Sequence, residues 1–169
     1  VFKELISKGI SFIHSDLDAI WLNDPIPSVV SAKSDLVFSQ GTIWPPDVHR
    51  KHGLVVCCGF FYARSCKQNR IFFKKVLERV NVEKDDQVSI NRLIGEYIYN
   101  WDVKNESWIA TNGEFFRVSN MPMIADIKNL AGAERLSVAI LPHSQFSRSF
   151  KSLEPDMIVA HPLSGKNCA

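Results

Sequence analysis

The stretch that decides the fold is GISFIHSDLDAIWLNDP, residues 9–25. Its first half, Ile10 to His14, is short and apolar and predicts a buried strand. Asp16 and Asp18 follow directly, before a second apolar run from Ala19 to Leu22. Side chains two residues apart on an extended segment point to the same side. We therefore expect both carboxylates to face one site at the end of this strand.

Two neighbouring carboxylates repel each other, and a bound divalent cation commonly relieves that repulsion. Such a cation can also bridge the two phosphates of a nucleotide and neutralise a departing diphosphate. In open α/β sheets, ligands gather at the carboxyl ends of strands, which is where Asp16 and Asp18 would lie. By itself, however, an Asp-x-Asp triplet occurs by chance in many proteins, and a turn or a helix cap is its more common explanation. The interpretation of this triplet therefore depends on the residues around it.

Composition predicts one globular domain over residues 1–169, since 46% of the residues are hydrophobic and 22% are charged. The 20 basic and 18 acidic residues are scattered along the chain, which argues against nucleic acid or an anionic membrane as a partner. No run approaches the ~20 apolar residues of a membrane helix. The four cysteines show no CxxC spacing, which argues against a zinc site and leaves a disulfide open. Because the chain begins in what reads as mid-helix, we expect an N-terminally truncated fragment.

The rest of the chain alternates between helical and strand-like patterns, which predicts an α/β domain. Gly41 to Gly53, with two prolines, predicts a long loop. Helices are predicted at Val1 to Lys8, Pro25 to Ala32, Lys67 to Val80 and from Asp85 or Asp86 onward. Further strands are predicted at Asp35 to Ser39, Leu54 to Ala63, Ser107 to Thr111, Phe115 to Ser119, Leu136 to Leu141 and Met157 to Ala160.

Residues 9–25 resemble the signature of the nucleotide-diphospho-sugar transferase family, which includes plant cell-wall arabinosyl- and xylosyltransferases. The resemblance covers nearly the whole chain. Its further motifs are Asp35-Leu-Val37, Cys58-Gly-Phe-Phe-Tyr62, Asp86-Gln87 before Asn91, Leu141-Pro142 before Phe146, and His161 followed by Gly165 and Lys166.

The resemblance implies a GT-A-type fold, a Rossmann-like mixed sheet flanked by helices, here lacking its first strand-helix unit. It further implies a metal-dependent hexosyl- or pentosyltransferase. The enzyme would move a sugar from a nucleotide diphosphate, a UDP-linked donor by this resemblance, to a glycan or glycoprotein hydroxyl with retention of configuration. The full-length protein would be a single-pass type II membrane protein of the Golgi lumen, held in the membrane only through an N-terminal anchor absent from this chain.

The resemblance also implies a set of site residues. Asp18 and His161 would ligate Mn²⁺ or Mg²⁺, and Asp16 would bind the metal or the donor ribose. Gly59 would let the backbone pass close to the donor, while a strand bulge is its alternative role. Gly165 and Lys166 would cradle the diphosphate.

Asp86 and Gln87 resemble the start of an acceptor-side motif and are predicted to be catalytic, with a helix cap as the alternative for Asp85 or Asp86. Relatives carry a second acid where this chain has Val88, so double displacement is not supported at that position. Two other functions stay open from sequence. One is a catalytically degenerate module that binds nucleotide sugar or glycan, and the other is a metal-dependent phosphohydrolase.

Overall fold

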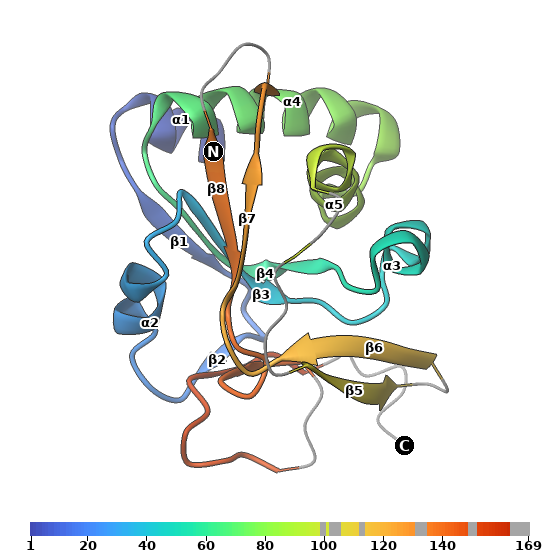
Figure 1. The fold of residues 1–169 in the computed structure, drawn as a ribbon. Helices are drawn as coiled ribbons and strands as arrows, with labels where there is room; N and C mark the ends of the chain where they lie inside the picture. The colour runs from blue at the N-terminus through green and yellow to red at the C-terminus, as the bar shows by residue number, and fades with distance from the viewer. Residues whose placement is uncertain (99–100, 102–105, 112–113, 131–134, 149–151, 163–169) are drawn as a thin grey trace.

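The computed structural model describes residues 1–98, 101, 106–111, 114–130, 135–148 and 152–162, and Figure 1 shows their arrangement. The helices are α1 (Phe2–Ser7), α2 (Ile26–Ser31), α3 (Pro46–His52), α4 (Lys67–Glu83) and α5 (Asp86–Tyr97). The strands are β1 (Phe12–Ser15), β2 (Ile20–Trp21), β3 (Leu36–Gln40), β4 (Val56–Ala63), β5 (Glu106–Thr111), β6 (Glu114–Ser119), β7 (Met123–Ile127), β8 (Leu136–Ile140), β9 (Phe146–Ser147) and β10 (Val159–Ala160). Helices and strands interleave along the chain, as the sequence predicts.

The largest sheet has five strands in the order β1-β4-β3-β8-β7. Strand β3 runs parallel to β8, whereas the other three pairings are antiparallel. The mixed sheet flanked by helices confirms the predicted fold class. Because β1, β3 and β8 run in the same direction, their carboxyl ends meet at one edge, and Asp16 follows β1 at that edge.

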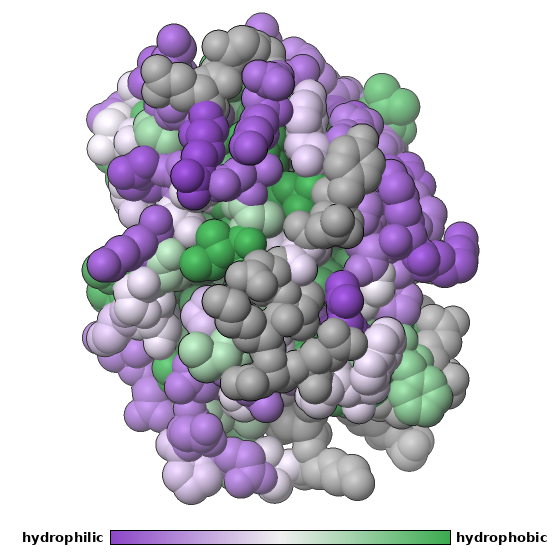
Figure 2. All heavy atoms as spheres, in the orientation of Figure 1, coloured by the Kyte–Doolittle hydropathy of each residue, from purple (hydrophilic) through white to green (hydrophobic). Residues whose placement is uncertain are grey.

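Both faces of the five-stranded sheet are covered. Leu36 and Phe38 of β3 face the side packed by α1, α4 and α5. Val37, between them, faces the opposite side, where it packs with α2 and with residues around β9 and β10. A strand covered on both faces reads as a continuous apolar run, which is why β3 and β4 were recognisable from sequence. In the view of Figure 2, hydrophilic side chains gather on the upper part of the molecule, where Figure 1 shows α4, β7 and β8.

Strand β4 contains an irregularity beside the Asp16/Asp18 segment. Its pairing with β3 moves from Phe61 opposite Phe38 to Cys57 opposite Ser39, so the residues from Cys58 to Phe60 are extra. Gly59 lies in this bulge. The extra residues also shift the alternation of β4, so that Cys58 rather than Cys57 shares the core face of Phe61 and Ala63.

Three sequence predictions need correction. Part of the predicted loop from Gly41 to Gly53 is helix α3, which begins at Pro46 and ends at Gly53 in a left-handed conformation (φ 73°). Proline in the first turn and glycine at the end are ordinary signals of a helix, and the prediction of a loop did not take them into account. Strand β7 was not predicted, and the strand predicted at Met157 to Ala160 is limited to β10 at Val159–Ala160. None of the described helices combines the length and apolar character that crossing a membrane requires.

Candidate active site

Asp16 and Asp18 lie in a tight turn at the end of β1. The Asp16 N–H donates to the Gly59 carbonyl (2.8 Å), and the Asp16 carbonyl accepts from the Ala19 N–H (3.1 Å). The backbone of the turn is therefore tied to the bulge of β4 on one side and closed on itself on the other. The two carboxylate side chains are half exposed to solvent, Asp16 at 50% and Asp18 at 52%.

A small three-stranded sheet brings His161 to this turn. Strand β10 pairs antiparallel with β2, which starts two residues after Asp18, and parallel with β9. His161 follows β10 directly, and its N–H donates to the Ser147 carbonyl (2.9 Å). Pairing β2 with β10 therefore joins a residue near the end of the chain to one near its beginning.

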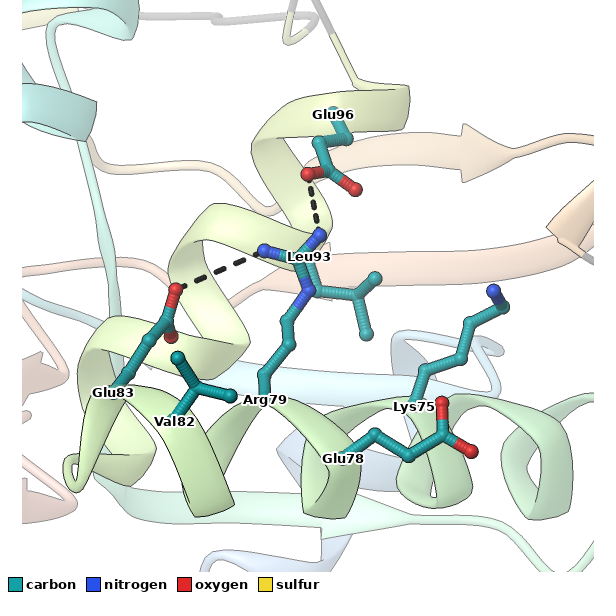
Figure 3. A pocket seen from close by; sticks show the side chains of 7 residues that line it. All are labelled: Lys75, Glu78, Arg79, Val82, Glu83, Leu93 and Glu96. Atoms are coloured by element: carbon teal, nitrogen blue, oxygen red, sulfur yellow. Dashed lines mark hydrogen bonds and ion pairs between the residues drawn. The ribbon is translucent and has the colours of Figure 1, made fainter.

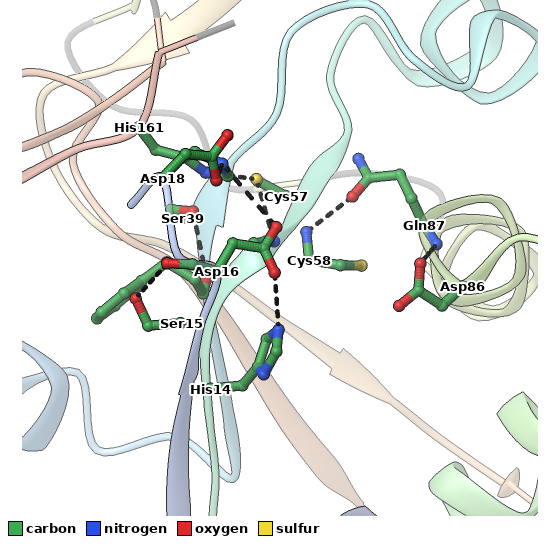
Figure 4. Close-up of polar contacts among 12 residues, drawn as sticks. His14, Ser15, Asp16, Asp18, Ser39, Cys57, Cys58, Asp86, Gln87 and His161 are labelled. Atoms are coloured by element: carbon green, nitrogen blue, oxygen red, sulfur yellow. Dashed lines mark hydrogen bonds and ion pairs between the residues drawn. The ribbon is translucent and has the colours of Figure 1, made fainter. Parts of the chain in front are cut away.

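The three side chains form one cluster (Figure 4). His161 Nε2 lies 3.1 Å from Asp18 Oδ1 and 4.0 Å from Asp16 Oδ2. One ligand atom from each residue lies within 4.8 Å of the others, a spacing that a single metal ion can span. Two carboxylates and an imidazole suit Mn²⁺, and carboxylates also suit Mg²⁺. The sequence therefore identified three side chains that the fold brings together.

Gly59 makes this cluster possible. A Cβ atom added at Gly59 would lie 2.0 Å from His161 Cε1 and 2.7 Å from Asp16 Oδ2. Both distances are shorter than van der Waals contact, so any side chain there would displace the imidazole. The side chains that the missing Cβ of Gly59 leaves room for are those of His161 and Asp16, and the predicted contact of Gly59 with the donor stays a prediction. The alternative role, a strand bulge, is present as well.

Further residues that were not predicted from the sequence surround Asp16, Asp18 and His161. His14 Nε2 lies 3.2 Å from Asp16 Oδ1. On the inner side of the cluster, the Cys57 sulfur lies 3.6 Å from His161 Nδ1 and accepts from Arg148 Nη1 (2.9 Å). Strand alternation points to His14, since it lies two residues before Asp16. No local signal identifies Cys57 or Arg148, because their contacts are made across the fold.

The two neighbouring cysteines differ electrostatically. Burial acts to raise the pKa of the Cys57 thiol, but the His161 hydrogen bond and the Arg148 charge outweigh it and lower that pKa to about 7. Burial raises the pKa of Cys58 well above its usual range. The Cys57 sulfur is therefore an electron-rich group behind His161, whereas Cys58 is an apolar core side chain.

Gln87 and Asp86 lie across β4 from the acidic cluster (Figure 4). Gln87 accepts a hydrogen bond from the Cys58 N–H (2.7 Å) and donates to the Val56 carbonyl (2.8 Å). Both ends of its amide thus brace the β4 backbone. The N-cap of α5 is Asp85, which accepts from the Val88 N–H, so the Asp86 carboxylate is not the cap. The catalytic role of Asp86 and Gln87 stays a prediction.

Two predicted residues, Gly165 and Lys166, lie outside the described residues. A cavity of about 370 Å³ lies between α4 and α5, away from the cluster residues (Figure 3). Its walls carry the ion pairs of Arg79 with Glu83 and Glu96. These charges neutralise each other, and no residue of the acidic cluster lines the cavity.

A comparison with protein families matches residues 1–162 to the profile described as nucleotide-diphospho-sugar transferase. No curated protein and no solved structure matches the chain. The family match covers more than nine-tenths of the chain and includes every element that builds the acidic cluster. This family implies a glycosyltransferase with a nucleotide-sugar donor and a glycan acceptor. The chain therefore belongs to the nucleotide-diphospho-sugar transferase family.

Proposed function

We propose that this chain is a metal-dependent glycosyltransferase in which Asp16, Asp18 and His161 hold Mn²⁺ or Mg²⁺ against the diphosphate of the donor. The observation that carries the proposal is the convergence of these three side chains within 4.8 Å from opposite ends of the chain.

The cluster suits a cation that must also bind a ligand. His161 is only 5% exposed and closes the inner side, while the two carboxylates are half exposed and leave the outer side open. A bound cation would act there as a Lewis acid that neutralises charge on the leaving diphosphate. Asp16 and Asp18 hold their carboxylates on a turn fixed by backbone hydrogen bonds, so little reorganisation is needed on binding.

Other residues of the chain would position the two substrates. Gly165 and Lys166 follow His161 in the sequence, and we propose that they contact the diphosphate through a backbone N–H and an ammonium. Gln87 keeps the bulged part of β4 in place beside the cluster, and the exposed Asp86 next to it is available to an acceptor. Val88 is buried and apolar, so that position supplies no nucleophile for a double displacement.

The finer assignments rest on the family resemblance. It supports a UDP-linked hexose or pentose as the donor, a glycan or protein hydroxyl as the acceptor, and retention of anomeric configuration. It also supports residence of the longer protein in the Golgi lumen through an N-terminal anchor. NMR of the anomeric proton in the first-formed product would decide retention, and fluorescence microscopy of the tagged full-length protein would decide location.

Titration of UDP in the presence and absence of Mn²⁺ tests the metal role. We expect calorimetry to show tighter UDP binding with Mn²⁺, and Asp18→Asn to remove that difference. Asp24→Asn is the matched control, since Asp24 only accepts from the Ile26 N–H at the start of α2, which asparagine can also do. Equal UDP binding with and without Mn²⁺ would contradict the proposal.

A catalytically degenerate binding module has the same cluster but no turnover. Incubation of the protein with Mn²⁺ and a panel of nucleotide sugars separates the two functions. Release of free nucleotide that depends on Asp18 is expected of the enzyme. Tight binding of a nucleotide sugar without any release identifies the module.

A further inference from the structure

The sulfur of Cys57 is surrounded by nitrogen atoms. Arg148 Nη1 lies 2.9 Å away, the Gly59 backbone nitrogen 3.4 Å away and His161 Nδ1 3.6 Å away. Cys57 is fully buried on the face of β4 opposite the Cys58 side chain. These contacts set the Cys57 sulfur apart from a cysteine that only fills space in the core.

Two of these three neighbours can only donate hydrogen bonds. A guanidinium carries N–H groups and no acceptor, and a backbone nitrogen is a donor. The Cys57 sulfur is therefore an acceptor toward Arg148 and Gly59, and the positive charge of Arg148 favours electron density on it. An acceptor sulfur facing His161 Nδ1 in turn favours a proton on Nδ1.

The protonation of Nδ1 determines what His161 presents to the acidic cluster. A neutral imidazole with its proton on Nδ1 has a free lone pair on Nε2, and Nε2 is the atom that faces Asp18. With the opposite tautomer, Nε2 carries the proton and cannot bind a cation. The groups behind a ligating histidine thus set the tautomer and the direction of the ring.

We propose that Cys57 is a positioning residue of this site: its sulfur, anchored by Arg148, accepts the Nδ1–H of His161 and keeps Nε2 directed at Asp16 and Asp18. The proposal rests on the proposed function in one respect, which is that the cluster binds a cation. The small sheet supplies two of the three partners of the sulfur, because Arg148 follows β9 and His161 follows β10.

Calorimetric titration with Mn²⁺ alone tests the proposal. Removal of a partner behind a metal-ligating histidine typically weakens metal binding about 10–100-fold, and we expect Cys57→Ala to fall in this range. Cys57→Ser should lose less, since a hydroxyl still accepts a hydrogen bond but has a shorter reach. Cys58→Ala is the matched control. It removes a buried sulfur from the adjacent residue and should leave the affinity for Mn²⁺ unchanged.

The ring of His161 can be examined separately from the affinity. Nitrogen-15 NMR of histidine-labelled full-length chain, with the His161 signal assigned by its loss in His161→Gln, should show Nδ1 protonated in the wild type saturated with Mg²⁺. Without a cation the Asp18 carboxylate, 3.1 Å from Nε2, competes for the ring proton. This measurement needs no folded Cys57 variant. A wild type that binds neither Mn²⁺ nor Mg²⁺ would contradict the proposed function, whereas a wild type that binds the cation with Nδ1 unprotonated would contradict the role of Cys57 alone.

Two results would overturn the proposal for Cys57. One is an unprotonated Nδ1 in the wild-type spectrum. The other is a folded Cys57→Ala variant that binds Mn²⁺ as tightly as the wild type and Cys58→Ala do.

Discussion

The five-stranded and three-stranded sheets have different roles in the molecule. In the large sheet, β3 and β8 are five residues long and are covered by side chains on both faces. In the small sheet, β2, β9 and β10 have two residues each, and β2 is exposed. The large sheet buries the apolar surface that stabilises the domain, while the small one joins distant segments and completes the acidic cluster. Stability and site geometry should therefore respond to different substitutions.

The largest loss of stability is expected from the large sheet. Phe61 is buried in β4 and its ring packs against those of Phe2, Phe38 and Phe73. Phe61→Ala should lower the free energy of unfolding by about 3–5 kcal/mol, measured by urea denaturation. The exposed Phe115 offers the matched control, and Phe115→Ala should change it by less than about 0.5 kcal/mol. Similar losses for the two variants would contradict the division between core and surface assumed here.

A pH-dependent loss of stability is expected from His143, which lies where the two sheets meet. His143, between β8 and β9, is buried against Phe116, and burial lowers its pKa from 6.5 to about 4. Between these two values the unfolded chain binds a proton at His143 that the folded chain does not. The free energy of unfolding should therefore fall as pH drops from 6.5 to 4, by up to roughly 3 kcal/mol.

Replacement of His143 by a group that does not titrate isolates this effect. Urea denaturation at several pH values should show a shallower decline in His143→Leu than in the wild type over this range. An identical pH dependence in both proteins would rule out His143 as the cause.

The acidic cluster should lose its Mn²⁺ affinity through a substitution that has little effect on the stability of the large sheet. Gly59→Ala places a methyl group where His161 and Asp16 now lie. We expect a loss of Mn²⁺ affinity at least as large as the 10–100-fold that disruption behind a ligand causes, measured by calorimetry. Ala63→Gly, in the core at the other end of β4, is the reverse control, since it should lower stability and leave Mn²⁺ binding intact. Tight Mn²⁺ binding by Gly59→Ala would show that His161 is not needed in its present place.

The smallest effect concerns the start of α5. Asp85 caps this helix, so Asp85→Ala should lower the free energy of unfolding by about 1 kcal/mol in urea denaturation. Asp86→Ala should leave stability nearly unchanged, because Asp86 accepts only from the adjacent Gln87 N–H. Equal losses would assign part of the cap to Asp86 and weaken its proposed availability to an acceptor.

The predictable parts of the molecule are those with a local signal. An apolar run that ends in Asp16 and Asp18 predicts both a strand and the position of a site, and β3 and β4 are readable because both their faces are buried. His161 was found through the family resemblance. Its distance from Asp18 along the chain is so large that no local pattern links the two.

The missed features depend on long-range contacts. Both residues of the adjacent cysteine pair are buried, but Cys58 packs in the apolar core and Cys57 does not. The bulge in β4 turns Cys57 to the other face, where Arg148 and His161 reach it only because β9 and β10 pair. Helix α3 was missed for a different reason, since two prolines and a tryptophan outweighed the helix signals at its ends.

Anomalous scattering from crystals grown with Mn²⁺ and UDP tests the central claim most directly. The account predicts one manganese peak within bonding distance of His161 Nε2 and the Asp18 carboxylate, with the UDP diphosphate on its outer side. A manganese peak elsewhere, or UDP bound in this position with no metal beside it, would contradict the claim that these residues form the metal site.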